Sequence, residues 1–554
     1  MKWTRLVSTW LFFAGVVTCW VSSGAATPLV VEELAHGSFT RGANGLRFDA
    51  ADRLHVASFL GREIVVLDAD SGDVLERVPR SSDTPDDLVF GPDGSMYWTS
   101  LLTGVVTRKA PDGSITSQVV GTSPNAIAAS DDGRLFVSEC LGGEVAGLYE
   151  LDPQLVAPPR LITDALGAGC ALNAMDFGPD GGLYGPRWFV GDVVRVDVDT
   201  AEMTVVTAGF EVPGAVKWGP DGALYVLDYG AGELWRYAPG AESLDLVASL
   251  TPGVDNLAFD SHGRLFVSHG VDSEIVEIEP DGAVRVVQPG GMVAPGGLAL
   301  VPRGHGRMSL WVADSYDLTE LDARTGEVLS VEQTGQGGIP LTTPQTVSAD
   351  GHNLLLTSWL QNRVQVWDPR TRRLLVDLAD FALPMDAVRF RGDLVVTEAL
   401  TGQVVMANHH DLQQRRAVAS GLVLPTGLAT NGRDLWVSDW ATGTIWQLAR
   451  RGRWLDSPVA IAEGLIQPEG LAVDRRGHLL VVEAGTGSLL RIHRRSHRVR
   501  ILVDGLDLGV SALPGLLPTW FFNGVDVDRA GRIYVSGDRG RLIYRIKRSR
   551  FGGH

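Results

Sequence analysis

One short pattern recurs along the whole chain: an apolar strand, an Asp/Gly turn, and a second apolar strand that ends in a polar residue. Three copies carry nearly the same turn, Gly-Pro-Asp-Gly, at 91–94, 178–181 and 219–222. Twelve copies follow one another at a spacing of about 40 residues. A repeat of this period with about four strands per copy is typical of propeller blades. The first strands begin at or beside Asn44, Asp86, Asn125, Asn173, Gly214, Asp255, Gly296, Gln345, Asp386, Thr426, Glu469 and Asn523.

Twelve blades exceed the four to eight that usually close one ring. We therefore predict an all-β fold, with tandem β-propellers whose twelve four-stranded blades form two six-bladed rings. The Pro/Gly-rich segment 289–297 marks the midpoint, which places the first propeller at 27–290 and the second at 291–554. A five-plus-seven division is the alternative. The last repeat leaves little chain for a fourth strand, so residues 29–34 are expected to close that blade and tie the two rings together.

The first 26 residues have the composition of a secretory signal peptide. Lys2 and Arg5 precede an apolar run at 11–21, and small residues follow at 23–26. A lipid anchor on Cys19 is a weaker alternative. The mature chain is therefore expected to be secreted or periplasmic, with no membrane span.

Two cysteines remain after this segment, Cys140 and Cys170. An even pair in an exported chain is often a disulfide, and the repeat places both residues on the same face of adjacent blades. Two buried free thiols are the alternative.

Composition and motifs exclude several classes of function. The net charge is −18, and the arginines between 491 and 500 alternate with apolar residues, which indicates the solvent face of outer strands rather than a nucleic-acid site. The chain has no phosphate-binding loop, no nucleophile elbow and no zinc-binding helix motif. We therefore do not expect a serine hydrolase or a nucleic-acid partner.

Polar residues open many of the first strands, and in a propeller these positions meet around the channel mouth. Asn and Asp oxygens are the ligands that Ca²⁺ prefers. The alternative is that these residues cap turns and hold channel water. We predict a divalent metal, most simply Ca²⁺, with candidate ligands Asn44, Asp86, Asn125, Asn173, Asp255, Asp386, Glu469 and Asn523.

The strand openings at 124–127, 468–471 and 523–526 resemble those of the SMP-30/gluconolactonase family and of the related NHL-repeat propellers. The resemblance implies a divalent metal held by one Glu, two Asn and one Asp in a six-bladed ring, where it acts on a lactone. Asn125 and Asn173 match the paired Asn. Gly214 stands where the Asp is expected and Asn44 where the Glu is expected, while the second ring lacks the Asn pair.

A hydrolase of this kind needs an acidic residue to accept a proton from water. Streptogramin-lyase-like propellers use a His and an acid with a metal, which keeps an elimination reaction open. The candidate catalytic residues are Asp86, Asp228, Asp255, Glu139 and His269.

Three functions are therefore expected from the sequence. The first is an exported, metal-dependent hydrolase of lactone or ester type that works in a channel mouth. The alternatives are a streptogramin-lyase-like elimination and a non-catalytic propeller pair that binds a protein, a glycan or a small ligand. Aromatic residues just beyond the second strands could stack on such a ligand: Trp188, Tyr229, Trp359 and Trp440.

Overall fold

The computed structural model describes residues 29–79, 82–140, 147–167, 169–334, 341–513 and 519–549 of the 554-residue chain. Within these residues the fold is all-β, with twelve four-stranded antiparallel sheets and one short 3₁₀ helix, η1 (Ala484–Thr486). Helices long and apolar enough to cross a bilayer are absent from the described residues. The predicted signal peptide at 1–26 lies outside them.

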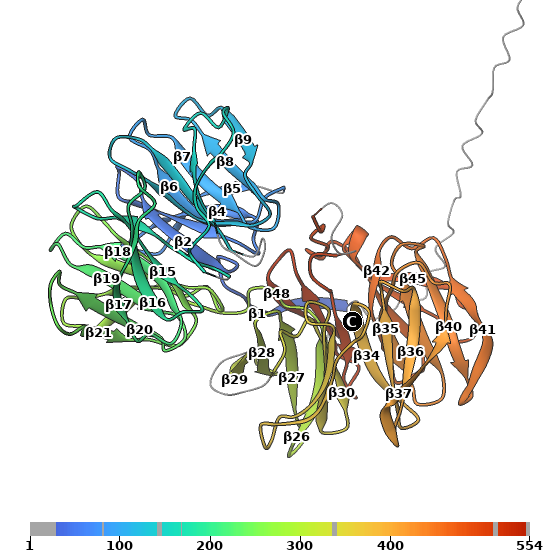
Figure 1. Ribbon diagram of the computed structural model, residues 1–554. Coiled ribbons are helices and arrows are strands. Elements are labelled where there is room, and N and C mark those ends of the chain that lie inside the picture. The colour runs from blue at the N-terminus through green and yellow to red at the C-terminus, as the bar shows by residue number, and fades with distance from the viewer. Residues whose placement is uncertain are drawn as a thin grey trace, which may run out of the picture.

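The first ring is built from six sheets whose strands follow one another in chain order (Figure 1). Its blades are β2 (Ala43–Phe48), β3 (Arg53–Ser58), β4 (Glu63–Asp68), β5 (Val74–Pro79); β6 (Pro85–Phe90), β7 (Met96–Ser100), β8 (Val105–Lys109), β9 (Ile115–Val119); β10 (Pro124–Ala129), β11 (Leu135–Glu139), β12 (Leu148–Leu151), β13 (Arg160–Thr163); β14 (Asp176–Phe177), β15 (Leu183–Arg187), β16 (Asp192–Val196), β17 (Met203–Ala208); β18 (Pro213–Trp218), β19 (Leu224–Asp228), β20 (Glu233–Tyr237), β21 (Asp245–Ser249); and β22 (Val254–Phe259), β23 (Leu265–His269), β24 (Ile275–Ile278), β25 (Val284–Gln288).

The second ring has six further sheets, the last of which includes the first strand of the chain. Its blades are β26 (Leu298–Gly304), β27 (Arg307–Asp314), β28 (Asp317–Asp322), β29 (Val328–Gln333); β30 (Thr346–Asp350), β31 (Asn353–Ser358), β32 (Arg363–Asp368), β33 (Arg373–Leu378); β34 (Pro384–Phe390), β35 (Asp393–Glu398), β36 (Gln403–Asn408), β37 (Asp411–Ala419); β38 (Pro425–Thr430), β39 (Leu435–Asp439), β40 (Thr444–Arg450), β41 (Arg453–Ala462); β42 (Pro468–Val473), β43 (Leu479–Glu483), β44 (Ser488–Ile492), β45 (Val499–Val503); and β46 (Val525–Val527), β47 (Ile533–Gly537), β48 (Leu542–Arg548), β1 (Leu29–His36).

The first strands of neighbouring blades contact one another in two closed cycles. One cycle runs β2, β6, β10, β14, β18, β22 and back to β2. The other runs β26, β30, β34, β38, β42, β46 and back to β26. The prediction of two six-bladed rings is therefore confirmed. Apolar residues of adjacent sheets fill the space between blades, as Leu54 of blade one and Phe266 of blade six do, each fully buried.

The two rings close in different ways. In the second ring, β1 pairs antiparallel with β48, and Glu32 forms ion pairs with Arg545 at 2.7 Å and with Lys547. This confirms the expected closure of the last blade by residues 29–34. The range 27–290 proposed for the first ring thus includes a strand that lies in the second.

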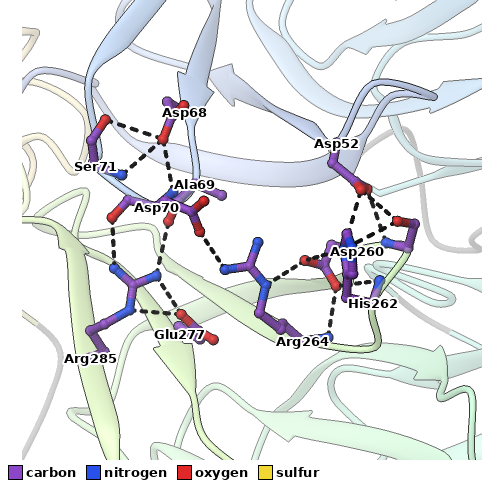
Figure 2. Close-up of polar contacts among 11 residues, drawn as sticks. Asp52, Asp68, Ala69, Asp70, Ser71, Asp260, His262, Arg264, Glu277 and Arg285 are labelled. Atoms are coloured by element: carbon purple, nitrogen blue, oxygen red, sulfur yellow. Dashed lines mark hydrogen bonds and ion pairs between the residues drawn. The ribbon is translucent and has the colours of Figure 1, made fainter.

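In the first ring, no strand crosses between blade one and blade six in the described residues, and side chains join them instead (Figure 2). Arg264 pairs with Asp260 at 2.6 Å and with Asp70 at 2.5 Å. Arg285 donates to the Ala69 and Asp70 carbonyls at 3.0 Å and also bonds Glu277. The seam lies on the face opposite to the strand-one openings.

The rings dock against each other through loops at their strand-one openings. The Trp520 indole N–H donates to the Leu60 carbonyl at 3.0 Å, and the Arg62 guanidinium donates to the Ser511 carbonyl at 2.5 Å. Arg41 donates to the Arg539 carbonyl at 2.6 Å. An apolar cluster spans the junction and contains Leu60, Val293, Ala294, Leu513, Trp520 and Phe521, with Phe59, Tyr316 and Val510 against it.

Candidate functional site

Most first strands begin with an irregularity in pairing that redirects one polar side chain. Pro124 pairs with Glu139, the register then shifts, and regular pairing resumes at Ile127. The same shift follows Ala43, Pro85 and Val254. A bulge of this kind re-aims a side chain and is common beside functional sites. We call the residue directly after the paired position the lead residue; in blade four, where Ala171 is paired, the name is given to the residue two places later. In the first ring the lead residues are Asn44, Asp86, Asn125, Asn173, Gly214 and Asp255.

The backbone of the lead residues is held by hydroxyl groups of the neighbouring blade. Ser268 donates to the Asn44 carbonyl at 2.7 Å, and Thr99 donates to the Asn125 carbonyl at 2.5 Å. Ser438 does the same for Glu469 in the second ring, at 2.7 Å. Because each hydroxyl comes from the next-to-last residue of a second strand, the positions of the lead residues are fixed by the ring itself.

Three lead residues of the first ring meet at its mouth. The Asn44 amide N–H donates to an Asp86 carboxylate oxygen at 2.7 Å. A Cβ atom built on Gly270 would lie 3.6 Å from the Asn44 Oδ1 and 3.5 Å from the Asp255 Cβ, so these two side chains meet over Gly270. We call Asn44, Asp86 and Asp255 the acidic mouth.

The two carboxyl groups of the acidic mouth lack a compensating cation in direct contact within the described residues. Burial and repulsion from Asp255 raise the pKa of Asp86 well above its usual range. Burial and repulsion from Asp87 raise the pKa of Asp255 to about 7, although His269 opposes the shift. Two carboxylates forced together without a counter-ion form a site that favours a cation.

The other two polar lead residues differ in their partners. Asn173 donates its amide N–H to the Gly214 carbonyl at 2.9 Å. Asn125 is 7 % exposed, and its side chain makes no hydrogen bond with the described residues. Asn125 is therefore free to offer its amide oxygen to a ligand.

The acids at the ends of second strands have another role. Both oxygens of Asp228 accept backbone N–H groups, from Glu211 at 2.7 Å and Val212 at 2.9 Å. Glu139 accepts the N–H of Thr122 at 2.7 Å. The same bond to the loop ahead of the first strand is made in the second ring by Asp314, Glu398, Asp439 and Glu483. These side chains hold a loop in place, and their backbone partners occupy the lone pairs that a catalytic base needs.

Both ring nitrogens of His269 also have partners within the protein. Its Nε2 lies 2.9 Å from the Pro252 carbonyl, to which it donates, and its Nδ1 lies 2.7 Å from an Asp272 carboxylate oxygen. Burial opposes protonation of His269, but the hydrogen bond and charge of Asp272 outweigh it and raise the pKa of His269 above its usual value. The imidazole is thus held as half of an ion pair.

The second ring places its candidate ligands differently. Pro384 pairs with Glu398 and pairing resumes at Ala387, so Met385 is the lead residue and Asp386 lies one position deeper. Asp386 accepts N–H groups from Ala387 and Leu428, both at 2.8 Å, which links two blades. Burial raises its pKa to about 7.

Glu469 and Asn523 form a closed pair in the second ring. One Glu469 oxygen accepts both the backbone N–H of Asn523 at 2.7 Å and its amide N–H at 2.8 Å. Burial and the charge of Asp538 raise the pKa of Glu469 to about 8. Glu469 lines a cavity of about 210 Å³ with Trp440 and Thr519. Of the predicted ligands, the structure therefore brings Asn44, Asp86 and Asp255 together and gives Asp386, Glu469 and Asn523 partners within the protein.

The rim of the first mouth carries the disulfide and two aromatic side chains. Cys140 and Cys170 form a disulfide between blades three and four, which confirms that prediction. The Cys170 carbonyl accepts the Trp188 N–H, and the Trp188 ring lies 4.8 Å from that of Tyr229. The bond closes a loop of 30 residues, which stabilises the fold by about 3–4 kcal/mol in the chain-entropy treatment.

One residue at the mouth comes from the other ring and was not expected from the sequence. Burial, followed by the charges of Tyr229, Asp86 and Asp255, raises the pKa of Tyr316 above its usual value. Tyr316 lies in the second ring, and its contact with the first depends on how the two rings dock. A repeat alignment carries no information on that docking.

A larger cleft of about 780 Å³ lies between the rings beside blade six. Asp272 and Glu274 line it from the first ring, and Asp317, Thr319 and Arg372 line it from the second. Burial and the charge of Asp272 raise the pKa of Asp317, and burial raises that of Glu274. The cleft therefore adds further acidic groups to the junction of the two rings.

Comparison with known proteins does not assign a family to this chain. No family model matches the chain. Virginiamycin B lyase of Nocardia farcinica (strain IFM 10152) is 30% identical over 150 residues, which cover 26% of this chain and 50% of that protein. The chain thus spans about half the length of this curated relative.

Two solved structures show low overall similarity. A streptogramin B lyase structure has a TM-score of 0.36 and 17% identity, with 52% of this chain and 96% of that chain covered. An extracellular domain of a one-component system from B. thetaiotaomicron has a TM-score of 0.32 and 13% identity, with 91% and 76% covered. The twelve four-stranded sheets and the two closed cycles of first strands identify the fold as a pair of β-propellers.

Proposed function

We propose that this chain is an exported, divalent-metal-dependent hydrolase of lactone or ester type, with its site in the mouth of the first ring. The carrying observation is the acidic mouth: Asp86 and Asp255 converge there, bridged by Asn44, without a cation in direct contact among the described residues. The disulfide supports export. The resemblance to SMP-30/gluconolactonase propellers supports the substrate class.

The residues of the mouth fit a hard cation such as Ca²⁺. Two carboxylates and the Asn44 and Asn125 amide oxygens are hard oxygen donors, and water can complete the six to eight ligands that Ca²⁺ takes. Groups of three or more His, Cys, Asp or Glu in a metal-binding arrangement are absent from the described residues, so amide oxygens are needed. When bound, the cation would polarise the carbonyl oxygen of the substrate.

The chain's own residues would handle the proton. In hydrolysis, a water oxygen bonds to the carbonyl carbon, the acyl C–O bond breaks, and the departing alkoxide takes up a proton. Asp255 has no hydrogen-bond donor among the described residues and so has lone pairs available to accept the proton of that water. General base catalysis of this kind contributes roughly 10²–10⁴-fold. Glu139, Asp228 and His269 are less suited because protein groups already occupy them.

The metal site is tested by comparing substitutions of Asp255, which lies in the acidic mouth, and Asp386, which links two blades of the second ring. We expect Ca²⁺ at 100 times its Kd to stabilise the protein by about 2.7 kcal/mol, measured by thermal unfolding after treatment with a chelator. Asp255→Asn should abolish this gain, whereas Asp386→Asn, which changes a group that links blades, should leave it intact. A panel of small lactones and esters then tests the reaction.

An unaltered melting point with Ca²⁺, Mg²⁺ and Mn²⁺ would overturn the metal site. Stabilisation without turnover of any ester or lactone would favour the non-catalytic propeller pair instead.

An elimination reaction is the second candidate, because the matched relative is a lyase. The two reactions differ in mass balance: hydrolysis adds one water to the products and elimination adds none. Mass spectrometry of the products therefore separates them. If elimination is found, the acid of the mouth would remove a proton from carbon rather than from water.

A further inference from the structure

Tyr316 stands at the tip of a tight hairpin in the second ring. Asp314 of β27 pairs with Asp317 of β28, so Ser315 and Tyr316 form a two-residue turn, with Ser315 at φ 52°. The Tyr316 carbonyl accepts two hydrogen bonds from Thr334, from its N–H at 3.0 Å and from its hydroxyl at 2.7 Å. The backbone of the hairpin tip is therefore held in place.

The Tyr316 side chain crosses from its own ring to the other. It packs against the apolar cluster that spans the junction, which includes Phe59 and Leu60 directly after β3 in blade one. Trp520 and Arg62 hold the same loops together with hydrogen bonds to Leu60 and Ser511. Tyr316 is thus held at the edge of the first mouth by contacts from both rings.

The Tyr316 ring packs at the edge of the first mouth, and its hydroxyl has no hydrogen-bond partner among the described residues. Asp86, Asp255 and Tyr229 are the charged or titratable groups close enough to affect its proton. The side chain of Tyr316 is partly buried, and the described residues provide no hydrogen bond to its hydroxyl. A tyrosine hydroxyl at the edge of the mouth that no described residue engages can form a hydrogen bond with a ligand that enters the mouth.

We infer that the ligand site of the first ring is shared between the rings, and that Tyr316 of the second ring completes it by hydrogen bonding to an oxygen of the bound ligand. The inference rests on the proposed function. It adds a positioning residue at the edge of the mouth and gives the second ring a role in the site. The substrates that fit are small carbonyl compounds that reach the acidic mouth beneath the Tyr316 hairpin.

The direct test places a spectroscopic probe on the hydroxyl-bearing ring. 3-Fluorotyrosine is incorporated at 316 in the full chain, and its ¹⁹F resonance is followed during a Ca²⁺ titration. We expect the resonance to shift along the same curve as the Ca²⁺ stabilisation and to stay fixed in Asp255→Asn. The matched control is 3-fluorotyrosine at 225, because the Tyr225 hydroxyl bonds Asp221 on the opposite face, at 3.3 Å.

The outcomes separate this inference from the proposed function. A Ca²⁺-stabilised protein whose 316 resonance does not move would overturn the shared site and leave the metal site standing. A protein that Ca²⁺ neither stabilises nor shifts would overturn both.

A second variant tests the hydrogen bond itself. Tyr316→Phe removes one oxygen that has no partner among the described residues, so it should fold normally. We expect kcat/KM for a hydrolysed ester to fall about two- to tenfold, the worth of one net hydrogen bond, with Tyr225→Phe unchanged. Equal kcat/KM for Tyr316→Phe and the wild type would remove the proposed role.

Discussion

At the scale of single residues, two sets of polar side chains at one face of the rings have separate tasks. Acids at the ends of second strands recur in both rings and hold the preceding loop, as Asp228 and Glu483 do. Acidic lead residues converge without a cation in direct contact only in the first ring among the described residues. These strand-end acids recur in both rings, which was visible in the sequence. Such recurrence indicates a structural role in every blade rather than a role in one functional site.

The loop-holding role predicts a stability effect at Asp228. Asp228→Ala leaves the N–H groups of Glu211 and Val212 without their acceptor, so the free energy of unfolding should fall by about 1–3 kcal/mol. Urea unfolding measures the change, and Ca²⁺ stabilisation should persist because the acidic mouth is intact. A loss of Ca²⁺ binding with unchanged stability would contradict this assignment.

The sequence identified the lead residues of the first ring but placed Asp386 one residue too near the mouth. The repeats align on the Asp/Gly turn between the first and second strands. The distance from that turn back to the bulge at the start of the first strand differs between blades, so the position of the bulge is not visible in the sequence. A shift of one position in a strand reverses the direction of the side chain. Asp386 therefore aligns with Asp87, whose oxygen likewise accepts an N–H from the next blade, at 3.1 Å from Ile127.

At the scale of elements, β1 is the strand that completes the last blade of the second ring. It covers the outer edge of β48 and adds the ion pairs of Glu32. An uncovered edge strand invites pairing with other chains. The position of β1 was predictable because the last repeat lacked a fourth strand, whereas the side-chain seam of Figure 2 was not, since its arginines resemble any others on a solvent face.

Removal of β1 should therefore affect the two rings unequally. In a chain that begins at residue 37, calorimetry should show an earlier unfolding transition for the second ring and an unaltered one for the first. The same variant should aggregate through β48, which light scattering detects. A control with Glu32→Ala loses only the ion pairs and should shift the transition slightly, because exposed pairs contribute about 0–1 kcal/mol each. Equal loss in both rings would show that β1 stabilises the junction and not the blade.

At the scale of the whole molecule, buried acids with raised pKa values accumulate where the rings meet. The pKa values of Asp86, Asp255 and Glu469 are all raised by burial, as are those of Asp314 and Asp317 in the hairpin that carries Tyr316. Such groups keep their protons in the folded state at pH values where the unfolded chain has lost them. The folded protein thus binds more protons than the unfolded chain in this range.

This predicts a dependence of stability on pH. Because the folded state binds more protons, the contribution of these acids is complete below about pH 4 and is lost as the pH rises through about 7. Without Ca²⁺, the melting temperature should therefore fall between about pH 5 and pH 8. Asp255→Asn should reduce the slope, and Ca²⁺ should offset the loss at high pH. A melting temperature that rises over this interval would contradict the prediction.

The pairing of β1 with β48 also sets an order of events during synthesis. The six blades from β2 to β25 are contiguous, so the first ring can form while the rest of the chain is still emerging. The opening strand has to wait for a partner more than five hundred residues downstream, from Leu29 to Arg548. The second ring can therefore close only after β48 has been synthesised, and this step joins two segments that lie far apart in the chain.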